Sequence, residues 1–160
     1  ALKGIDNLEN ALLRDYSDIN VTQGNELINS CNMKDKVKFV KGDAFDKESF
    51  KGIAKQFNIG VVSGLYELFN DNQAILTSLS GMYEAIEDNG YLIYTNQPWH
   101  PQLEFIAFVL TSFRENQPWI MRCRTQAEMD ALVEKSGFTK IEEYTDEQGI
   151  FTVSIAKKSK

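Results

Sequence analysis

Two segments, ALLRDYSD at residues 11–18 and VKFVKGDAFD at residues 37–46, decide the fold class of this 160-residue chain. In each segment a short apolar run ends at an aspartate, Asp15 in the first and Asp43 in the second. This pattern is typical of parallel strands that lead into helices, and ligands of open α/β sheets bind outside the carboxyl ends of such strands. An acid at that place can accept hydrogen bonds from ribose hydroxyls or an adenine amino group. The two segments therefore predict a nucleoside-shaped ligand.

The rest of the chain continues the alternation of short apolar runs and longer amphipathic stretches, which indicates an α/β fold. We expect strands at 10–14, 37–41, 59–63, 90–95, 139–145 and 149–157, and helices at about 18–31, 47–57, 71–88, 101–114 and 125–136. Candidate helix caps are Asp46, Asp71 or Asn72, and a Thr125 to Glu128 capping box. A short polar gap at 146–149 predicts that the last two strands form an antiparallel hairpin beside an otherwise parallel sheet.

Composition limits the function. With 42% hydrophobic and 25% charged residues, the chain fits a single globular domain over residues 1–160. A net charge of −6 argues against a nucleic-acid partner, which requires a positive surface. Cys31, Cys123 and a lone histidine do not form a metal-ligand pattern, and unpaired cysteines favour a cytoplasmic location without a metal site. The longest apolar runs are too short for a membrane span of about 18 residues or more.

The strand order, the acidic strand ends, the Gly137-Phe138 pair and the closing hairpin resemble class I methyltransferases that use S-adenosylmethionine. Four segments are similar to a bacterial group of methyltransferases whose domain commonly follows an α/β-hydrolase, lysophospholipase-like domain: 13–17, 63–69, 94–104 and 149–154. The run from Gln97 to Glu104 is the most specific part. The resemblance implies a Rossmann-like transferase that methylates a small-molecule or lipid-like acceptor. It also makes a hydrolase domain a candidate partner in the full-length protein.

One departure from that family concerns its first strand and the Asp-x-Gly-x-Gly turn that follows it. Nothing before Asp15 matches that turn, and Gly4 stands alone. We therefore expect an N-terminally truncated domain without the first strand, which is central in the family order 3-2-1-4-5-7-6. Either strands 10–14 and 59–63 pair directly, or another chain fills the position, because unpaired buried amides are costly. Association into homo-oligomers, weak cofactor binding and an inactive fragment are the expected consequences.

The resemblance assigns the cofactor contacts to the ends of three strands. Asp15 accepts from the ribose hydroxyls with Tyr16 near the adenine, and the segment from Asp43 reads the adenine edge. The alternative for both acids is a turn or helix cap, which aspartate also favours. The predicted cofactor-binding residues are Asp15, Tyr16, Asp43, Ala44, Phe45, Ser63 and Gly64.

The predicted acceptor-side, catalytic residues are Tyr66, Trp99 and His100. For Tyr66 the alternative is core packing, and for the single histidine it is a structural role beside Pro101. Glu67 could accept a proton or hold a substrate amine, but the favoured interpretation is an acid in the first turn of a helix. Arg122 and Arg124 could bind an anionic substrate, but the favoured interpretation is a solvated pair on an extended segment. The rival functional class is a noncatalytic, Rossmann-like module that binds a nucleotide or a partner, and an upstream Gly-rich turn would argue against it.

Overall fold

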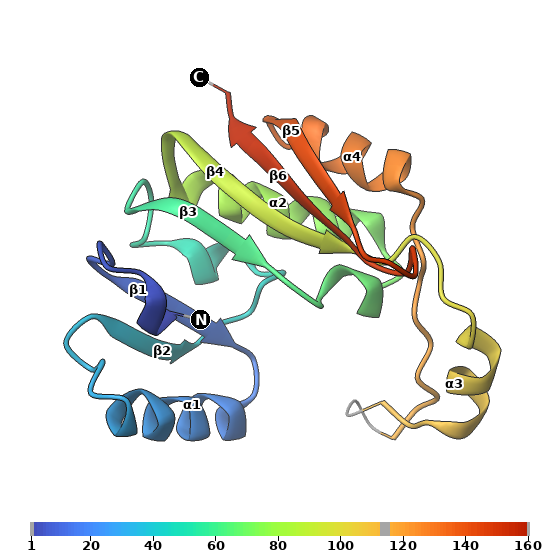
Figure 1. Cartoon of the computed structure of the whole chain (residues 1–160), viewed down its shortest axis with the longest axis horizontal. Helices are drawn as coiled ribbons and strands as arrows, with labels where there is room; N and C mark the ends of the chain where they lie inside the picture. Colours follow the sequence, from blue (N-terminus) through green and yellow to red (C-terminus); the bar gives the residue numbers. More distant parts are fainter. Residues whose placement is uncertain (1, 113–115, 160) are drawn as a thin grey trace. The chain divides into compact units, whose positions relative to one another are not determined.

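A computed structural model describes residues 2–112 and 116–159 of the chain. The chain divides into two compact units, Ala1–Ser49 and Phe50–Lys160 (Figure 1). Each unit has its own sheet, of order β1-β2 in the first unit and β3-β4-β6-β5 in the second. Both sheets are accompanied by helices, which confirms the predicted α/β class.

The first unit is a β-α-β motif. Its elements are η1 (Leu2–Gly4), β1 (Ala11–Asp15), α1 (Asp18–Ser30) and β2 (Val37–Lys41). The two strands are parallel, and their register places Asp15 opposite Lys41. The side chain of Ser17 caps α1 by accepting a hydrogen bond from the Asn20 amide. Gly24 lets the helix lie close to the sheet, because a Cβ there would be 2.0 Å from a ring carbon of Phe39.

The second unit is a mixed four-stranded sheet. Its strands are β3 (Phe57–Val62), β4 (Ile86–Asn96), β5 (Phe138–Thr145) and β6 (Thr152–Lys158). β3 and β4 are parallel, whereas β6 is antiparallel to both β4 and β5. The last two strands therefore form the predicted hairpin. Its turn is closed by the Gly149 amide, which donates to the Asp146 carbonyl at 3.0 Å.

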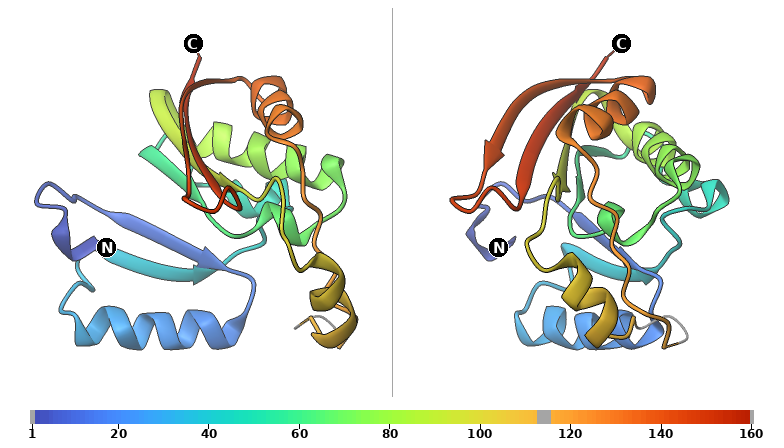
Figure 2. Two further views of the ribbon diagram at one scale, coloured as in Figure 1. Left: turned by 45° about the vertical axis from the view of Figure 1, so that its right-hand side comes forward. Right: turned by 90° about the vertical axis from the view of Figure 1, so that its right-hand side faces the viewer.

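Helices α2 (Asn72–Ala85) and α4 (Gln126–Lys135) cover one face of this sheet (Figure 2). The core between them is fully buried and includes Ile75, Leu79, Leu92, Met129 and Val133. Apolar side chains also occur in the strands as exposed residues, among them Ile59, Val61, Tyr91, Ile141 and Val153. Within the described residues, no helix is long and apolar enough to cross a membrane.

The predicted helix caps are found where the sequence places them. Asp71 caps α2 by accepting from the Gln73 amide at 2.8 Å, and Asp46 accepts from the Glu48 amide at 2.9 Å. Thr125 caps α4 by accepting from the Glu128 amide at 3.1 Å. The Glu128 side chain instead accepts hydrogen bonds from Asn72 and Arg122, so it serves tertiary contacts.

Three predicted helices differ from the structure. The helix expected at 47–57 is wrong, because only the turn η2 (Lys47–Phe50) forms before Gly52 and Lys55 adopt positive φ angles of 86° and 52°. The helix expected at 71–88 ends at Ala85, because Ile86 already pairs with β3. The helix expected at 101–114 is shorter, with α3 spanning Leu103–Val109, and positions 113–114 lie outside the described residues.

The direct pairing of strands 10–14 and 59–63 is also wrong. Within the described residues β1 pairs with β2 alone and β3 pairs with β4 alone. In the family order, the strand expected to lie next to both is the first one. Each of these two strands therefore has one unpaired edge within the described residues, and the strand order within each sheet matches the resembled family.

Candidate functional site

Asp15 and Asp43 lie at the carboxyl ends of neighbouring parallel strands, as predicted. The Gly42 amide donates to the Asp15 carbonyl at 3.0 Å, so the hydrogen bonds between β1 and β2 extend to the residue before Asp43. Each carboxylate accepts from the amide two residues further on, Asp15 from Ser17 and Asp43 from Phe45, both at 2.8 Å. These two matching turns hold the carboxylates at one edge of the first sheet.

Both acids retain capacity for a ligand. The second oxygen of Asp15 accepts from Asn20 Nδ2 at 3.1 Å, and a carboxylate offers about four acceptor positions. Near Asp43, burial lowers the pKa of Arg14, and the charge of Asp43 opposes that shift. Arg14 Nη2 donates to the Ser49 carbonyl at 2.5 Å. The predicted turn roles of these acids thus exist, and they leave hydrogen-bond acceptors available.

The residues after the two acids differ in exposure. Tyr16 is 72% exposed, and Lys41 Nζ lies 5.8 Å from the centre of its ring. Lys41 also pairs with Asp18 at 2.7 Å. Ala44 and Phe45, which follow the second acid, are half-buried. An aromatic face and backbone amides therefore accompany the carboxylates in the first unit.

The end of β3 is an open turn. Ser63 and Gly64 are exposed, and Gly64 has φ of 67°. Its amide donates to Thr95 Oγ1 at 2.8 Å, which ties the end of β3 to the end of β4. The positive φ favours glycine and leaves the backbone accessible from the carboxyl side of the strands.

Tyr66 lies in the core, which is the alternative role that the sequence analysis gave for this residue. The residue is 1% exposed in the turn η3 (Tyr66–Leu68), and its hydroxyl lies 3.1 Å from Ser78 Oγ. Burial raises the pKa of Tyr66, and the Ser78 hydrogen bond opposes the shift. The geometry therefore favours a packing role for Tyr66, and its acceptor-side role stays a prediction.

Trp99 and His100 follow β4 as predicted and remain accessible. Trp99 is exposed, whereas His100 is half-buried and its Nδ1 accepts from the Gln102 amide at 3.1 Å. A hollow of about 470 Å³ is lined by residues 100–105. The hydrogen bond fixes the His100 ring near the start of α3, and the other ring nitrogen is not required for that bond.

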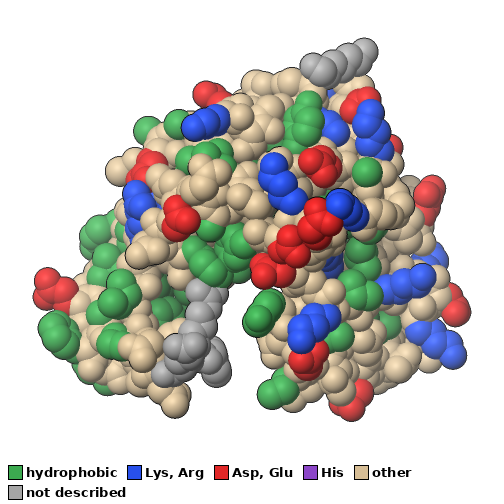
Figure 3. All heavy atoms as spheres, turned by 180° about the vertical axis from the view of Figure 1, so that it is seen from behind, with side chains coloured by type: hydrophobic (Ala, Val, Ile, Leu, Met, Phe, Trp, Pro, Cys, Tyr) green, Lys and Arg blue, Asp and Glu red, His purple; other side chains and the backbone are tan. Residues whose placement is uncertain are grey.

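An apolar surface surrounds α3. None of the seven described residues of this helix is buried. Figure 3 shows hydrophobic side chains gathered over the lobe that carries α3. The exposed members are Trp99, Phe105, Phe108, Val109, Leu110 and Ile120. This surface, which we call the α3 apolar surface, follows directly from the loop that carries Trp99 and His100.

Arg124 is a structural centre that sequence reasoning missed. It is 1% exposed rather than solvated, and its guanidinium donates to Asn72 Oδ1 at 2.8 Å and to the carbonyls of Tyr66 and Phe69 at 2.7 Å. The Asn96 amide also donates to the Arg124 carbonyl at 3.1 Å. Arg122, by contrast, is half-buried. No local sequence signal separates these two arginines.

Two buried acceptors next to these residues lack hydrogen bonds. Across residues 2–112 and 116–159, Glu67 Oε2 and Gln97 Oε1 are the buried side-chain oxygen or nitrogen atoms without a partner. Leaving such a group unpaired costs about 1–3 kcal/mol. Burial raises the pKa of Glu67, while its own backbone amide and the Arg124 charge oppose this shift. The sequence placed Glu67 in a helix turn and offered no sign that its carboxylate is buried.

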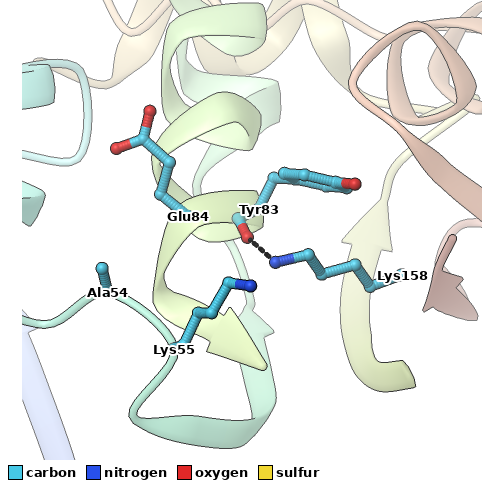
Figure 4. Close-up of a pocket in the computed structure, with 5 residues that line it drawn as sticks. All are labelled: Ala54, Lys55, Tyr83, Glu84 and Lys158. Atoms are coloured by element: carbon cyan, nitrogen blue, oxygen red, sulfur yellow. Dashed lines mark hydrogen bonds between the residues drawn. The ribbon is translucent and has the colours of Figure 1, made fainter. Parts of the chain in front are cut away.

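A second hollow of about 440 Å³ lies near the amino ends of β3 and β4 (Figure 4). Lys158 reaches its edge, where Nζ donates to the carbonyls of Tyr83 and Ile86 at 2.7 Å. The ammonium also lies 3.5 Å from Asp88. These contacts satisfy the end of α2, and ligands of α/β sheets bind at the opposite, carboxyl end. We therefore interpret this hollow as a feature of the packing and not as a ligand-binding site.

Solved structures with the same fold define its class. They include a "possible exported protein" from Bordetella parapertussis, with 18% identity, a TM-score of 0.73, and 94% of this chain and 54% of that chain covered. A SAM-dependent methyltransferase from Methanosarcina mazei has 14% identity, a TM-score of 0.72, and coverages of 93% and 82%. An O-methyltransferase family protein from Burkholderia thailandensis has 13% identity, a TM-score of 0.69, and coverages of 93% and 42%. The fold is thus that of class I methyltransferases.

Sequence comparison identifies the family. Residues 1–158 match the family described as "Putative methyltransferase", and the chain belongs to this family. The Escherichia coli K12 protein YnbC is 51% identical over 145 residues, which are 91% of this chain. The chain spans only 25% of the length of YnbC and 54% of the Bordetella protein. The methyltransferase resemblance seen in the sequence is confirmed.

Proposed function

We propose that this chain contributes the cofactor and acceptor contacts of an S-adenosylmethionine-dependent methyltransferase. The observation that carries the proposal is the pair Asp15 and Asp43, which end neighbouring parallel strands in matching turns. Family membership supports the reaction class. A ligand with ribose hydroxyls and an adenine amino group has the donors that these carboxylates accept.

In this proposal Asp15 accepts from the ribose hydroxyls and Tyr16 lies against the adenine. Asp43 accepts from the adenine amino group, while the Ala44 amide donates to the ring and Phe45 lines it. We also propose Ser63 and Gly64 as cofactor contacts at the exposed end of β3. S-adenosylmethionine supplies an electrophilic methyl group when it is bound. The protein contributes mainly alignment of nucleophile, carbon and sulfur, which accelerates such displacements.

The acceptor side is assigned to the loop after β4. Trp99 and His100 are accessible there, and the α3 apolar surface adjoins them in sequence. Burying exposed apolar side chains is favourable by about 25 cal/mol per Å². We therefore propose a small-molecule or lipid-like acceptor with an apolar part. Tyr66 would support this region from the core through its bond to Ser78.

We extend the proposal to the domain organisation, the partners and the location of the protein. We propose that residues 1–160 act as one domain and that a further strand covers the unpaired edge of β3. Residues 1–160 alone would then bind the cofactor weakly, catalyse nothing and associate through free edges. From the resemblance we further propose a hydrolase domain in the full-length protein, and from the two unpaired cysteines a cytoplasmic location. The noncatalytic nucleotide-binding module remains the alternative function.

Calorimetry of S-adenosylhomocysteine binding tests this function in residues 1–160 and in a form extended upstream. In the extended form, Asp15→Asn should weaken binding by about 1.5–3 kcal/mol, which is the loss of a charge-assisted hydrogen bond. Asp35→Asn is the matched control, because Asp35 is exposed near the amino end of β2 and carries the same charge. Unchanged affinity in Asp15→Asn, or an extended form that does not bind, would overturn the proposal.

A further inference from the structure

The unpaired acceptors Glu67 Oε2 and Gln97 Oε1 share a place in the fold. Glu67 follows β3 and Gln97 follows β4, which are parallel neighbours paired up to Val62 and Tyr94. The Gly64 amide bonds to Thr95 Oγ1 just beyond that pair. Both acceptors therefore belong to the carboxyl end of the same two strands.

Contacts with neighbouring residues locate the Glu67 carboxylate within this region. A Cβ built on Gly64 would lie 3.9 Å from Glu67 Oε1, so the carboxylate is near the exposed turn. The Glu67 carbonyl accepts from the Arg122 amide at 2.8 Å. The Cys123 thiol is close enough that the Glu67 charge contributes to raising its pKa, after burial. Glu67 thus lies between the β3 turn and the segment at 122–123.

An ion-pair role does not explain this carboxylate. The Arg124 guanidinium is near Glu67, but it donates hydrogen bonds to Asn72, Tyr66 and Phe69. The Arg122 side chain bonds to the Asn70 carbonyl and to Glu128, each at 2.5 Å. Glu67 is 7% exposed and Gln97 is 3% exposed, so bulk water does not satisfy them either. Two buried acceptors without a protein donor, both at the carboxyl ends of neighbouring strands, leave room for a donor that a ligand supplies.

We propose that Glu67 and Gln97 bind the primary amine of a methyl acceptor and that Glu67 removes its proton. This rests on the proposed methyltransferase function. A primary amine can donate to two acceptors from one atom, whereas a hydroxyl has one hydrogen to donate. Both acceptor atoms are covered, so binding of the amine requires a local opening at the carboxyl ends of β3 and β4. The nearby Trp99 provides a surface for an apolar substituent.

The chemical step balances. The bound ammonium transfers one proton to Glu67 Oε2, which leaves a lone pair on nitrogen. That pair forms the bond to the methyl carbon while the carbon–sulfur bond breaks and its electrons remain on sulfur. The products are a secondary ammonium ion and a thioether, and Glu67 later releases its proton to water. Burial raises the Glu67 pKa, which makes the carboxylate a stronger proton acceptor at neutral pH.

An NMR titration of the 160-residue chain with benzylamine tests the site without cofactor. The reporter is the backbone amide of Gly64, which lies beside Glu67. We expect a saturable shift with benzylamine and none with benzyl alcohol. Glu67→Gln and Gln97→Met should each weaken the affinity for benzylamine at least tenfold. Glu87→Gln should leave it unchanged, because Glu87 is exposed near the start of β4 and makes the same charge change.

The outcomes are separable from those of the cofactor experiment. No saturable shift with benzylamine, equal response to benzyl alcohol, or equal affinity in Glu67→Gln would overturn the amine site. If Glu67→Gln fails to fold, Gln97→Met decides the matter by the same criterion. Failure of S-adenosylhomocysteine binding in the extended form would overturn the methyltransferase proposal even where benzylamine binds.

Discussion

Replacing Arg124 by alanine should destabilise the second unit more than any nearby surface change. The guanidinium joins η3 to the start of α2 through the carbonyls of Tyr66 and Phe69 and the side chain of Asn72. Arg124→Ala leaves these three acceptors without their donor at a position that is 1% exposed. The connection between the end of β3 and α2 therefore depends on one side chain.

The magnitude follows from those contacts. Each acceptor left unpaired in a buried place costs about 1–3 kcal/mol, and losses within one network are not additive. Removing the charge also relieves its own desolvation, which lowers the pKa of Arg124. We therefore expect Arg124→Ala to lower the free energy of unfolding by about 3–5 kcal/mol, as for other broken buried networks. Arg124→Lys keeps a charge without the planar fork, so its loss should be smaller.

Urea unfolding followed by tryptophan fluorescence measures this free energy. Trp99 and Trp119 both lie in the second unit, so the signal reports that unit. Arg122→Ala is the matched control, because its side chain is 38% exposed and its salt bridge should contribute about 1 kcal/mol or less. A loss for Arg124→Ala of less than about 1 kcal/mol, or one equal to that of Arg122→Ala, would refute the reasoning.

Two further predictions use the same unfolding measurement. Because burial raises the Glu67 pKa, the native state holds the extra proton between the unfolded and folded pKa values, so wild-type stability falls as pH rises through that window, from about pH 4.3 upward. Glu67→Gln lacks this dependence, and a stability difference that does not change with pH would contradict the assignment. Gly81→Ala places a Cβ 2.4 Å from the Phe50 ring and should cost about 1–3 kcal/mol. Glu84→Ala, at an exposed position of the same helix, serves as its control, and equal effects of the two would contradict this packing.

Elements governed by local chemistry were predictable from the sequence. The Asp71 cap and the hairpin turn at Asp146 depend on neighbours within a few residues, and both form as expected. The helix expected at 47–57 did not form, because Lys55 and Gln56 donate backbone hydrogen bonds to the carbonyls of Glu84 and Ala85. Those partners lie at the end of another helix, where a sequence window does not reach.

In the candidate site, the placement of the two acids was predictable from the sequence, whereas the packing of Tyr66 was not. Asp15 and Asp43 were expected to be neighbours, because consecutive parallel strands end at the same edge, and their register agrees. Tyr66 was assigned to the acceptor side because a tyrosine after a strand fits either a site or a core. Its partner Ser78 lies within α2, and only the packing of that helix on the sheet reveals the hydrogen bond.

The two arginines show why one charged side chain is buried while its near neighbour in the sequence is not. Arg122 and Arg124 are separated by one residue and have the same side chain, yet only Arg124 faces three oxygens whose positions depend on η3 and α2. Three of its N–H groups donate to these oxygens, whereas Glu67 Oε2 has the positive charge nearby but no hydrogen-bond partner. The arrangement therefore stabilises the turn after β3 while leaving the carboxylate free to bind a donor. A buried arginine that served Glu67 directly would have removed that capacity.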